Sequence, residues 1–323
     1  MKLTLAPMEG VIDHHMRHIL TRVGGYHHCV TEFVRITDQL LPPVVFHRIC
    51  PELAQASETD VGTPITIQLL GGIASVMAEN GQRAAELGAA AIDINFGCPS
   101  RFTNSKVGGA VLLKEPERIF EITAAVRKAV PKTLAVSAKI RLGYENTDLA
   151  LENAAAIEAA GASFITVHAR TKVDGYHHPA RWEWLGTIND ALTIPLVANG
   201  DINSVEDFLR CRAVSGCQDF MLGRGALIQP DLARQIAAVQ AQPLQLQPFV
   251  PLMNWREASV LVAELVKLMQ AQPGIQQKKV LGRMKQWLVY LRRRYPEAGV
   301  LFSEIRSLKA LQPAQALLRL SAA

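Results

Sequence analysis

The stretch AIDINFGCPS, residues 91–100, shows the unit from which the fold is built: an apolar strand that runs into a tight turn. Glycine permits a tight backbone path and proline cannot continue a hydrogen-bonded ladder, so the strand should end near Asn95. Cys98 should then lie on a turn just past the end of the strand. Side chains at such a position face a ligand.

The same unit recurs along the first 230 residues, where short apolar runs alternate with amphipathic, helix-like stretches. Strict alternation predicts a parallel sheet, and eight repeats favour an α/β fold of the closed (β/α)₈ TIM-barrel type. An open doubly wound sheet is the weaker alternative, because no GxGxxG follows the first run. The eight predicted strands cover residues 3–8, 29–34, 65–69, 91–95, 134–140, 164–168, 195–199 and 219–223, and the predicted helices include 73–87, 116–130, 149–160 and 205–211.

The chain should divide into two domains. Its 323 residues are 49% hydrophobic, which is enough for a large core. We expect a catalytic barrel over 1–240, a proline-containing linker at 240–251 and an all-helical domain over 241–323. Two irregular stretches, 38–63 and 101–113, should be loops over the mouth of the barrel. Expected helices of the second domain are 255–272, 275–295 (closed by Pro296) and one or two more after 297.

Composition also narrows the class of protein. The five cysteines are scattered and form no CxxC pair, which speaks against a disulfide framework or a zinc site and favours the cytoplasm. The adjacent histidine pairs cannot easily share one ion, so we expect no metal. No signal peptide or membrane span is apparent, and we expect a monomer that does not bind membranes.

Charge is distributed unevenly. Residues 241–323 carry 12 lysines and arginines against four acidic residues, a net +8, whereas the rest of the chain is at −3. Within 275–295 there are seven cations and no acid, next to a helically spaced apolar set. A solvated helix face is the usual explanation of such a run, but this excess favours a helix that follows the phosphates of a nucleic acid.

Barrel enzymes place their active sites at the C-terminal ends of the strands, and polar or special residues end nearly every predicted strand here. Glycines after the seventh and eighth strands would let backbone N–H groups approach a phosphate. Phosphosugar isomerases, decarboxylases and flavin enzymes all use such a corner. The strand-end residues are Pro7-Met8-Glu9, Glu32, Gln68, Asn95 with Cys98, Lys139 with Arg141, His168 with Arg170, Asn199-Gly200-Asp201 and Gly223-Arg224-Gly225.

Two of these side chains suggest chemistry. Lys139 would be a fixed cation beside a developing negative charge, or else a lysine with its head in solvent. Cys98 could be a buried apolar residue, a nucleophile with a lowered pKa, or a general acid, since a thiol with an ordinary pKa of about 8.5 is mostly protonated at neutral pH. The residues alone do not choose between the last two.

These motifs together resemble the tRNA-dihydrouridine synthases over almost the full chain. The segments at 37–53 and 284–292 look most like the branch that acts on uridine-16 of the D-loop. The resemblance rests on LAPMEGV (5–11), VTEFVR (30–35), IQLLG (67–71), INFGCPS (94–100), AKIRLG (138–143), VHART (167–171), ANGDI (198–202) and MLGRGAL (221–227).

The resemblance implies a flavin mononucleotide (FMN) enzyme that reduces the C5–C6 double bond of a tRNA uridine with NADPH, Cys98 being the general acid. The alternatives are an FMN barrel reductase of a small enone or pyrimidine, a flavin-free phosphate-binding barrel, and a catalytically silent tRNA chaperone. The implied FMN-binding residues are Pro7, Met8, Glu9, Gln68, Lys139, His168, Asn199, Gly200, Asp201, Gly223 and Arg224; the implied tRNA-binding residues are Arg35, Asn95, Tyr176, Lys279, Arg283 and Lys285.

Overall fold

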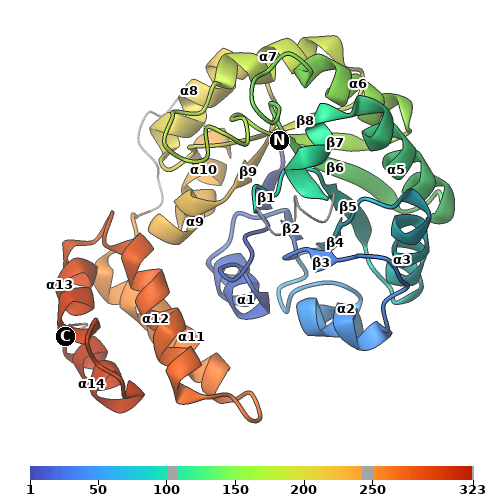
Figure 1. Ribbon diagram of the computed structural model, residues 1–323. Coiled ribbons are helices and arrows are strands. Elements are labelled where there is room, and N and C mark those ends of the chain that lie inside the picture. Colours follow the sequence, from blue (N-terminus) through green and yellow to red (C-terminus); the bar gives the residue numbers. More distant parts are fainter. Residues whose placement is uncertain (101–107, 242–250, 322–323) are drawn as a thin grey trace. The chain divides into compact units, whose positions relative to one another are not determined.

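The strands form a closed ring of parallel β-structure (Figure 1). The computed structural model describes residues 1–100, 108–241 and 251–321. The ring closes because β2 pairs with both β1 and β4, and β1 also pairs with β9. This confirms the predicted TIM barrel. The strands are β1 (Leu3–Leu5), β2 (His28–Val30), β3 (Val34–Arg35), β4 (Ile65–Leu70), β5 (Ala91–Asn95), β6 (Ala135–Arg141), β7 (Phe164–His168), β8 (Leu196–Asn199) and β9 (Asp219–Leu222).

The second predicted strand is divided into β2 and β3, so nine strands occupy eight positions in the ring. Val30 pairs with Thr66 and Val34 pairs with Leu69, which leaves one extra residue on the β2–β3 side. Such an insertion is a β-bulge, and it bends a strand at the rim of a barrel. The side-chain hydroxyl of Thr31 accepts a hydrogen bond from the backbone of Gln68 at 3.1 Å and so links the bulge to β4.

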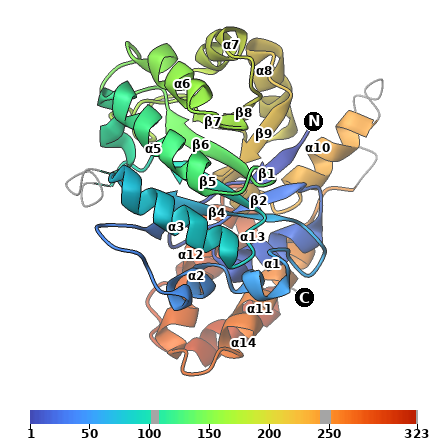
Figure 2. The same cartoon turned by 90° about the vertical axis from the view of Figure 1, so that its right-hand side faces the viewer.

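Helices cover the outside of the ring (Figures 1 and 2). The predicted helices are present, with ends shifted by at most four residues. The stretch 38–63 is not an irregular loop as predicted, because it contains α2 and a 3₁₀ turn at Pro51–Gln55, both begun by prolines whose missing N–H costs nothing at a first helical position. The helices outside the ring are α2 (Pro43–Ile49), α3 (Ala74–Glu86), α5 (Pro116–Ala129), α6 (Ala150–Ala159), α7 (Trp182–Ala191) and α8 (Val205–Ser215).

Alternation along the strands sends polar side chains into the barrel and apolar ones toward the helices. In β5, Ile92 and Ile94 are fully buried and alternate with Asp93 and Asn95, which are also buried. The inside of the ring holds a small apolar cluster of Ala6, Val30, Val197 and Met221, against which Phe164 packs. The barrel interior is therefore a packed core that carries polar groups at one level.

The chain falls into two compact units: residues 1–14, 26–202 and 206–223, and residues 15–25, 203–205 and 224–323. The predicted boundary after residue 240 stays a prediction. In the second unit α11 packs on α12, α12 on α13, and α13 on α14. The helices are α1 (His14–Val23), α9 (Arg224–Ile228), α10 (Leu232–Ala241), α11 (Trp255–Gln270), α12 (Gln277–Leu291), α13 (Pro296–Ile305) and α14 (Leu311–Ser321).

Sequence explains the starts of α11 and α13. Asn254 and Glu257 form a reciprocal capping box at the start of α11. The prediction that Pro296 closes α12 was wrong. α12 ends at Leu291, and Pro296 occupies the first turn of α13. Of the expected loop at 101–113, residues 101–107 lie outside the described residues, as does most of the expected linker, 242–250. The described part of that loop is not irregular as predicted, because Gly109–Lys114 form a 3₁₀ helix, after which the Glu115 N–H donates to the carbonyl of Leu112 at 2.9 Å. Within the described part of the chain, no helix is both long and apolar enough to cross a membrane.

Candidate functional site

Three polar residues on neighbouring strands lie in register inside the barrel. Gln68 of β4 is paired with Asp93 of β5, which is paired with Ser137 of β6. Gln68 Nε2 donates to Asp93 Oδ2 at 2.7 Å, and Ser137 Oγ donates to Asp93 Oδ1 at 2.6 Å. Burial raises the pKa of the Asp93 carboxyl, and the hydrogen bonds from Ser137 and Gln68 oppose this shift.

Asn95 connects this group to the turn after β5. Its Nδ2 donates to Gln68 Oε1 at 2.8 Å, and its Oδ1 accepts from the backbone N–H groups of Gly97 (2.8 Å) and Cys98 (2.9 Å). The side chain of Asn95 thus replaces the ladder partners that the chain loses where the strand ends.

Cys98 lies on a turn past the end of β5, as predicted. Its side chain is nearly buried, with 8% of the residue exposed, and packs with Phe33 and Leu70. Its carbonyl accepts a hydrogen bond from the backbone of Ala110 at 3.0 Å. The turn is therefore held on both sides of the thiol.

Lys139 lies two residues after Ser137 on β6 and is paired with Asn95 of β5. Its Nζ donates to Asn199 Oδ1 at 3.2 Å, and Asn199 Nδ2 in turn donates to the carbonyl of Met221 at 2.8 Å. Burial, together with the nearby charge of Arg141, lowers the pKa of Lys139 to about 8, although Asp93 acts in the opposite direction. Among the described residues, Asn199 is the one hydrogen-bond acceptor of this ammonium group, which has three donors.

Arg141 brings Tyr176 toward the strand ends. The arginine Nε donates to the carbonyl of Gly97 at 2.8 Å, and its Cζ lies 5.6 Å from the centroid of the Tyr176 ring. The ring of His168, which ends β7, is 6.0 Å from that of Tyr176. Tyr176 itself is 55% exposed, so its ring is presented to solvent from a loop that begins beyond β7.

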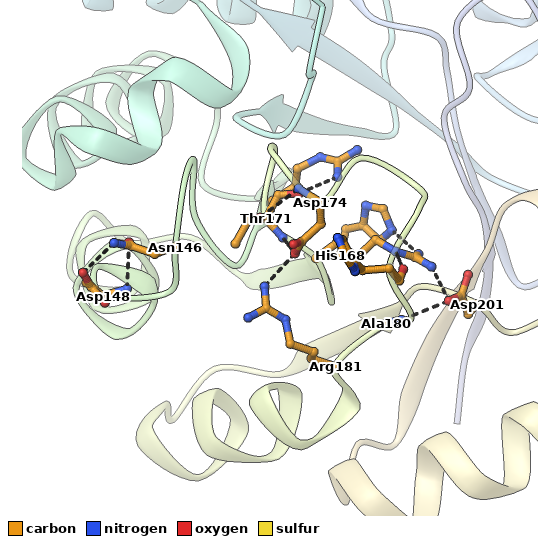
Figure 3. A network of polar contacts seen from close by, with 11 residues as sticks. Asn146, Asp148, His168, Thr171, Asp174, Ala180, Arg181 and Asp201 are labelled. Carbon is orange, nitrogen blue, oxygen red and sulfur yellow. Dashed lines mark hydrogen bonds and ion pairs between the residues drawn. The ribbon is translucent and has the colours of Figure 1, made fainter.

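The turn after β8 has an unusual backbone. Gly200 has φ +127°, and a Cβ at this position would lie 3.1 Å from His168 Cδ2 and 3.2 Å from Ala180 Cβ. Asp201 follows in the left-handed region with φ 52°. Its carboxylate pairs with Arg170 and accepts from the backbone of Ala180 at 3.0 Å (Figure 3), so the side chain fixes the turn.

A second polar group surrounds the loop after β7. Asp174 accepts from the backbone of Thr171 at 2.8 Å and pairs with Arg181 at 2.6 Å (Figure 3). These bonds hold the loop that carries Tyr176.

The end of β1 supplies the other predicted residues. Glu9 pairs with Arg35 at 3.3 Å, and both groups are partly exposed. A Cβ on Gly223, just after β9, would lie 3.6 Å from Met8 Sδ, so Gly223 keeps space open beside the segment that starts at Pro7. Arg224 follows Gly223 directly and begins α9.

The three predicted tRNA contacts of α12 differ in their surroundings. Lys279 is exposed. Arg283 is partly buried and donates to Gln286. The Nζ of Lys285 donates to the carbonyls of Arg306 (3.0 Å) and Leu308 (2.7 Å), where it caps the C-terminal end of α13.

Gln68, Asn95 and Cys98 thus form one hydrogen-bonded group, and Lys139 and Asn199 form another, both at strand ends, as their places in the sequence predicted. The prediction missed Asp93 and Ser137, which lie one pleat below the strand ends. The alternation of Asp93 with two isoleucines was the available signal. Over residues 1–100, 108–241 and 251–321, no group of three or more His, Cys, Asp or Glu side chains could hold a metal ion.

Comparison with known proteins gives a consistent result. The model of the family described as "Dihydrouridine synthase (Dus)" matches residues 4–318. A protein of Pseudomonas putida called tRNA-dihydrouridine(16) synthase is 49% identical over 306 residues, covering 95% of this chain and 93% of its own. Proteins with the same name from Pseudomonas syringae pv. tomato (48%, covering 95% and 94%) and Shewanella oneidensis (46%, covering 97% and 95%) are similar.

Solved structures that resemble this chain support the fold. A 2-naphthoyl-CoA reductase complex has a TM-score of 0.56 at 13% identity, covering 75% of this chain and 50% of that chain. A histamine dehydrogenase from Rhizobium sp. 4-9 has a TM-score of 0.54 at 14% identity, covering 81% and 48%. This chain therefore spans about half the length of each of these two proteins.

Proposed function

The chain belongs to the dihydrouridine synthase family, and on that premise we propose that it reduces the C5–C6 double bond of uridine-16 in the D-loop of tRNA, with FMN as cofactor and NADPH as reductant. The observation that carries the proposal is the hydrogen-bonded series that joins Cys98 to Asn95 and Gln68, at the level of the Lys139 ammonium group. The near-complete match to proteins named for position 16 supports that position.

The residues present fit a flavin mononucleotide. Lys139 has more hydrogen-bond donors than acceptors around it within the described chain, and its charge suits the electron-rich pyrimidine end of a flavin. The turn at Gly200 and Asp201 places successive backbone groups in a tight, left-handed path of the kind that binds phosphate. At Gly223 the missing side chain leaves space beside Met8.

On this proposal, Lys139 and Gln68 orient the ring system, and Asn199 holds Lys139 in place. Asp201 acts mainly through its backbone, because its carboxylate already binds Arg170. When bound, a reduced flavin supplies the hydride that the uracil accepts at C6. The remaining residues that would hold the cofactor are Pro7, Met8, Glu9, His168, Gly200, Gly223 and Arg224.

Cys98 completes the reduction by donating the proton of its Sγ to C5 of the uracil. Hydride at C6 and proton at C5 together saturate the double bond, and the thiolate is reprotonated from solvent. The hydrogen bonds from the turn to Asn95 and from Ala110 fix the backbone of Cys98. For the Cys98 thiol, the structure supports a fixed position more than an enhanced reactivity.

The substrate has to leave its stack in the tRNA before it can reach Cys98, at a cost of a few kcal/mol. Asn95 and Tyr176 would hold the base, and Arg35 the neighbouring nucleotides. Contacts of Lys279, Arg283 and Lys285 with the phosphate backbone would offset the cost. The net +8 of residues 241–323 supports tRNA over a small-molecule substrate. The proposal includes a monomer that acts in the cytoplasm.

Transient kinetics of Cys98→Ala test the proposal. Reduction of the flavin by NADPH should stay normal, because the thiol is not needed for hydride uptake. Reoxidation by unmodified tRNA should slow by at least about 100-fold, the usual contribution of a general acid. Cys211→Ala, which removes another buried thiol, is the control and should reoxidise normally. Equal slowing of both half-reactions in Cys98→Ala would argue against the role of Cys98.

A further inference from the structure

Asp93 is a buried carboxyl group in the middle of β5. Only 2% of the residue is exposed, and both oxygens are engaged, one by Gln68 and the other by Ser137. Burying a carboxyl group is costly unless hydrogen bonds compensate for the lost water. A position that only filled the barrel would be better served by an apolar side chain, so the polar contacts of Asp93 call for an explanation.

The contacts of Asp93 determine the orientation of two side-chain amides. Asp93 Oδ2 accepts from Gln68 Nε2, so Gln68 turns its Nε2 toward Asp93 and its Oε1 toward Asn95. Asn95 must then donate through Nδ2 to Gln68 Oε1, and its Oδ1 is left to accept from the turn. Reversing either amide would place two donors face to face.

The end of this series is the backbone of the Cys98 turn. Asn95 Oδ1 accepts from Gly97 and Cys98 at 2.8 and 2.9 Å. An inverted Asn95 would present an NH₂ group to two N–H groups, and both hydrogen bonds would be lost. A carboxylate on one strand thus controls, through two amides, whether the turn that carries the thiol is held.

We propose that Asp93 is a positioning residue for the reaction: through Gln68 and Asn95 it fixes the turn that carries Cys98. The consequence for uridine reduction rests on the proposed function. Gln68 is a member of the same series, so Asp93 orients with one carboxylate both the amide proposed to meet the flavin and the turn that carries the proton donor.

Residue-resolved hydrogen exchange of backbone amides in the full-length protein tests this proposal. In Asp93→Ala, exchange at Gly97 and Cys98 should accelerate by at least about fivefold, the factor expected for one lost hydrogen bond. Exchange at Ala6, whose N–H is bonded to Leu222 in the same barrel, should change less than about twofold. Acceleration confined to the turn supports the proposal. Unchanged exchange at the turn, or equal acceleration at Ala6, overturns it.

Three further variants sharpen the test. Asp93→Asn retains an acceptor for Gln68 and can donate to Ser137, so it should restore slow exchange at the turn. Ser137→Ala removes a hydrogen bond to the same carboxylate without interrupting the series, and it should leave the turn protected. If Asp93→Ala does not fold, Gln68→Leu cuts the series one step later and must show the same selective acceleration, or the proposal fails.

The same samples separate this proposal from the proposed function. Dihydrouridine formation in unmodified tRNA is measured with each protein and NADPH. If wild-type protein forms none while the exchange pattern is as expected, the proposed function is wrong and the positioning of the turn by Asp93 stands. If wild-type protein is active and Asp93→Ala exchanges like wild type, the positioning role is wrong and the function stands.

Discussion

Lys139→Met should make the protein more stable at neutral pH while removing its ability to bind flavin. Burial lowers the pKa of Lys139 from 10.5 in the unfolded chain to about 8. The unfolded chain therefore binds more protons between about pH 8 and 10.5, and stability rises with pH across that window. Below pH 8 the buried charge lowers the free energy of unfolding by about 3 kcal/mol, since one unit of pKa corresponds to about 1.4 kcal/mol.

The assay is urea unfolding of flavin-free protein at pH 7 and at about pH 9.5. Linkage gives a cost of about 3 kcal/mol at the lower pH and about 1 kcal/mol at the higher one. The advantage of Lys139→Met over wild type should therefore be about 2 kcal/mol larger at pH 7. Lys128→Met, on the exposed face of α5, is the control and should stay within about 0.5 kcal/mol of wild type at both.

A stability advantage of Lys139→Met that does not depend on pH would contradict this prediction, because it would mean that Lys139 is not held in a desolvating site. The second part of the prediction concerns the cofactor: the variant should be purified without flavin absorption bands. Gain of stability together with loss of binding is typical of a residue kept for function.

Two more predictions concern the turn after β8 and the helix α12. Gly200→Ala should lower the unfolding free energy by about 3 kcal/mol, because φ is +127° and the new Cβ meets His168 and Ala180, whereas Gly216→Ala, at φ +66° with nothing within 4 Å, should cost about 1 kcal/mol. Equal losses in urea unfolding would contradict this. Lys285→Met should lower the free energy of unfolding by about 1–2 kcal/mol through loss of the cap on α13. Lys279→Met should keep the free energy of unfolding within about 0.5 kcal/mol of wild type. It should also reduce the slope of the logarithm of tRNA affinity against the logarithm of salt concentration by about one unit. An unchanged slope would remove Lys279 from the interface.

The fold could be predicted because its signals are local. Each strand of the barrel is a short apolar run, and each run is followed by a helix with its own periodicity. The division of β2 from β3 could not be predicted, because the extra residue is visible only in the pairing of both strands with β4. Pro296 shows the same limit on a smaller scale: proline ends one helix or begins the next, and the chain between Leu291 and Pro296 decides which.

The sequence predicted the site residues at the strand ends but not those that lie deeper in the barrel. Residues such as Asn95 and Lys139 were found because the barrel dictates where ligands bind. Asp93 was missed because its importance lies in partners on two other strands, and this depends on register. Lys285 looks like the other cations of α12 in the sequence, yet the carbonyls that it caps are 21 and 23 residues away.

Position-resolved mass spectrometry of dihydrouridine in tRNA shows whether this protein modifies uridine-16, with tRNA taken from cells that contain or lack the protein. We expect loss of dihydrouridine at position 16 alone in cells that lack the protein, with restoration by the wild-type chain and not by Cys98→Ala. Dihydrouridine that persists at position 16, or that disappears from a different position, would contradict it.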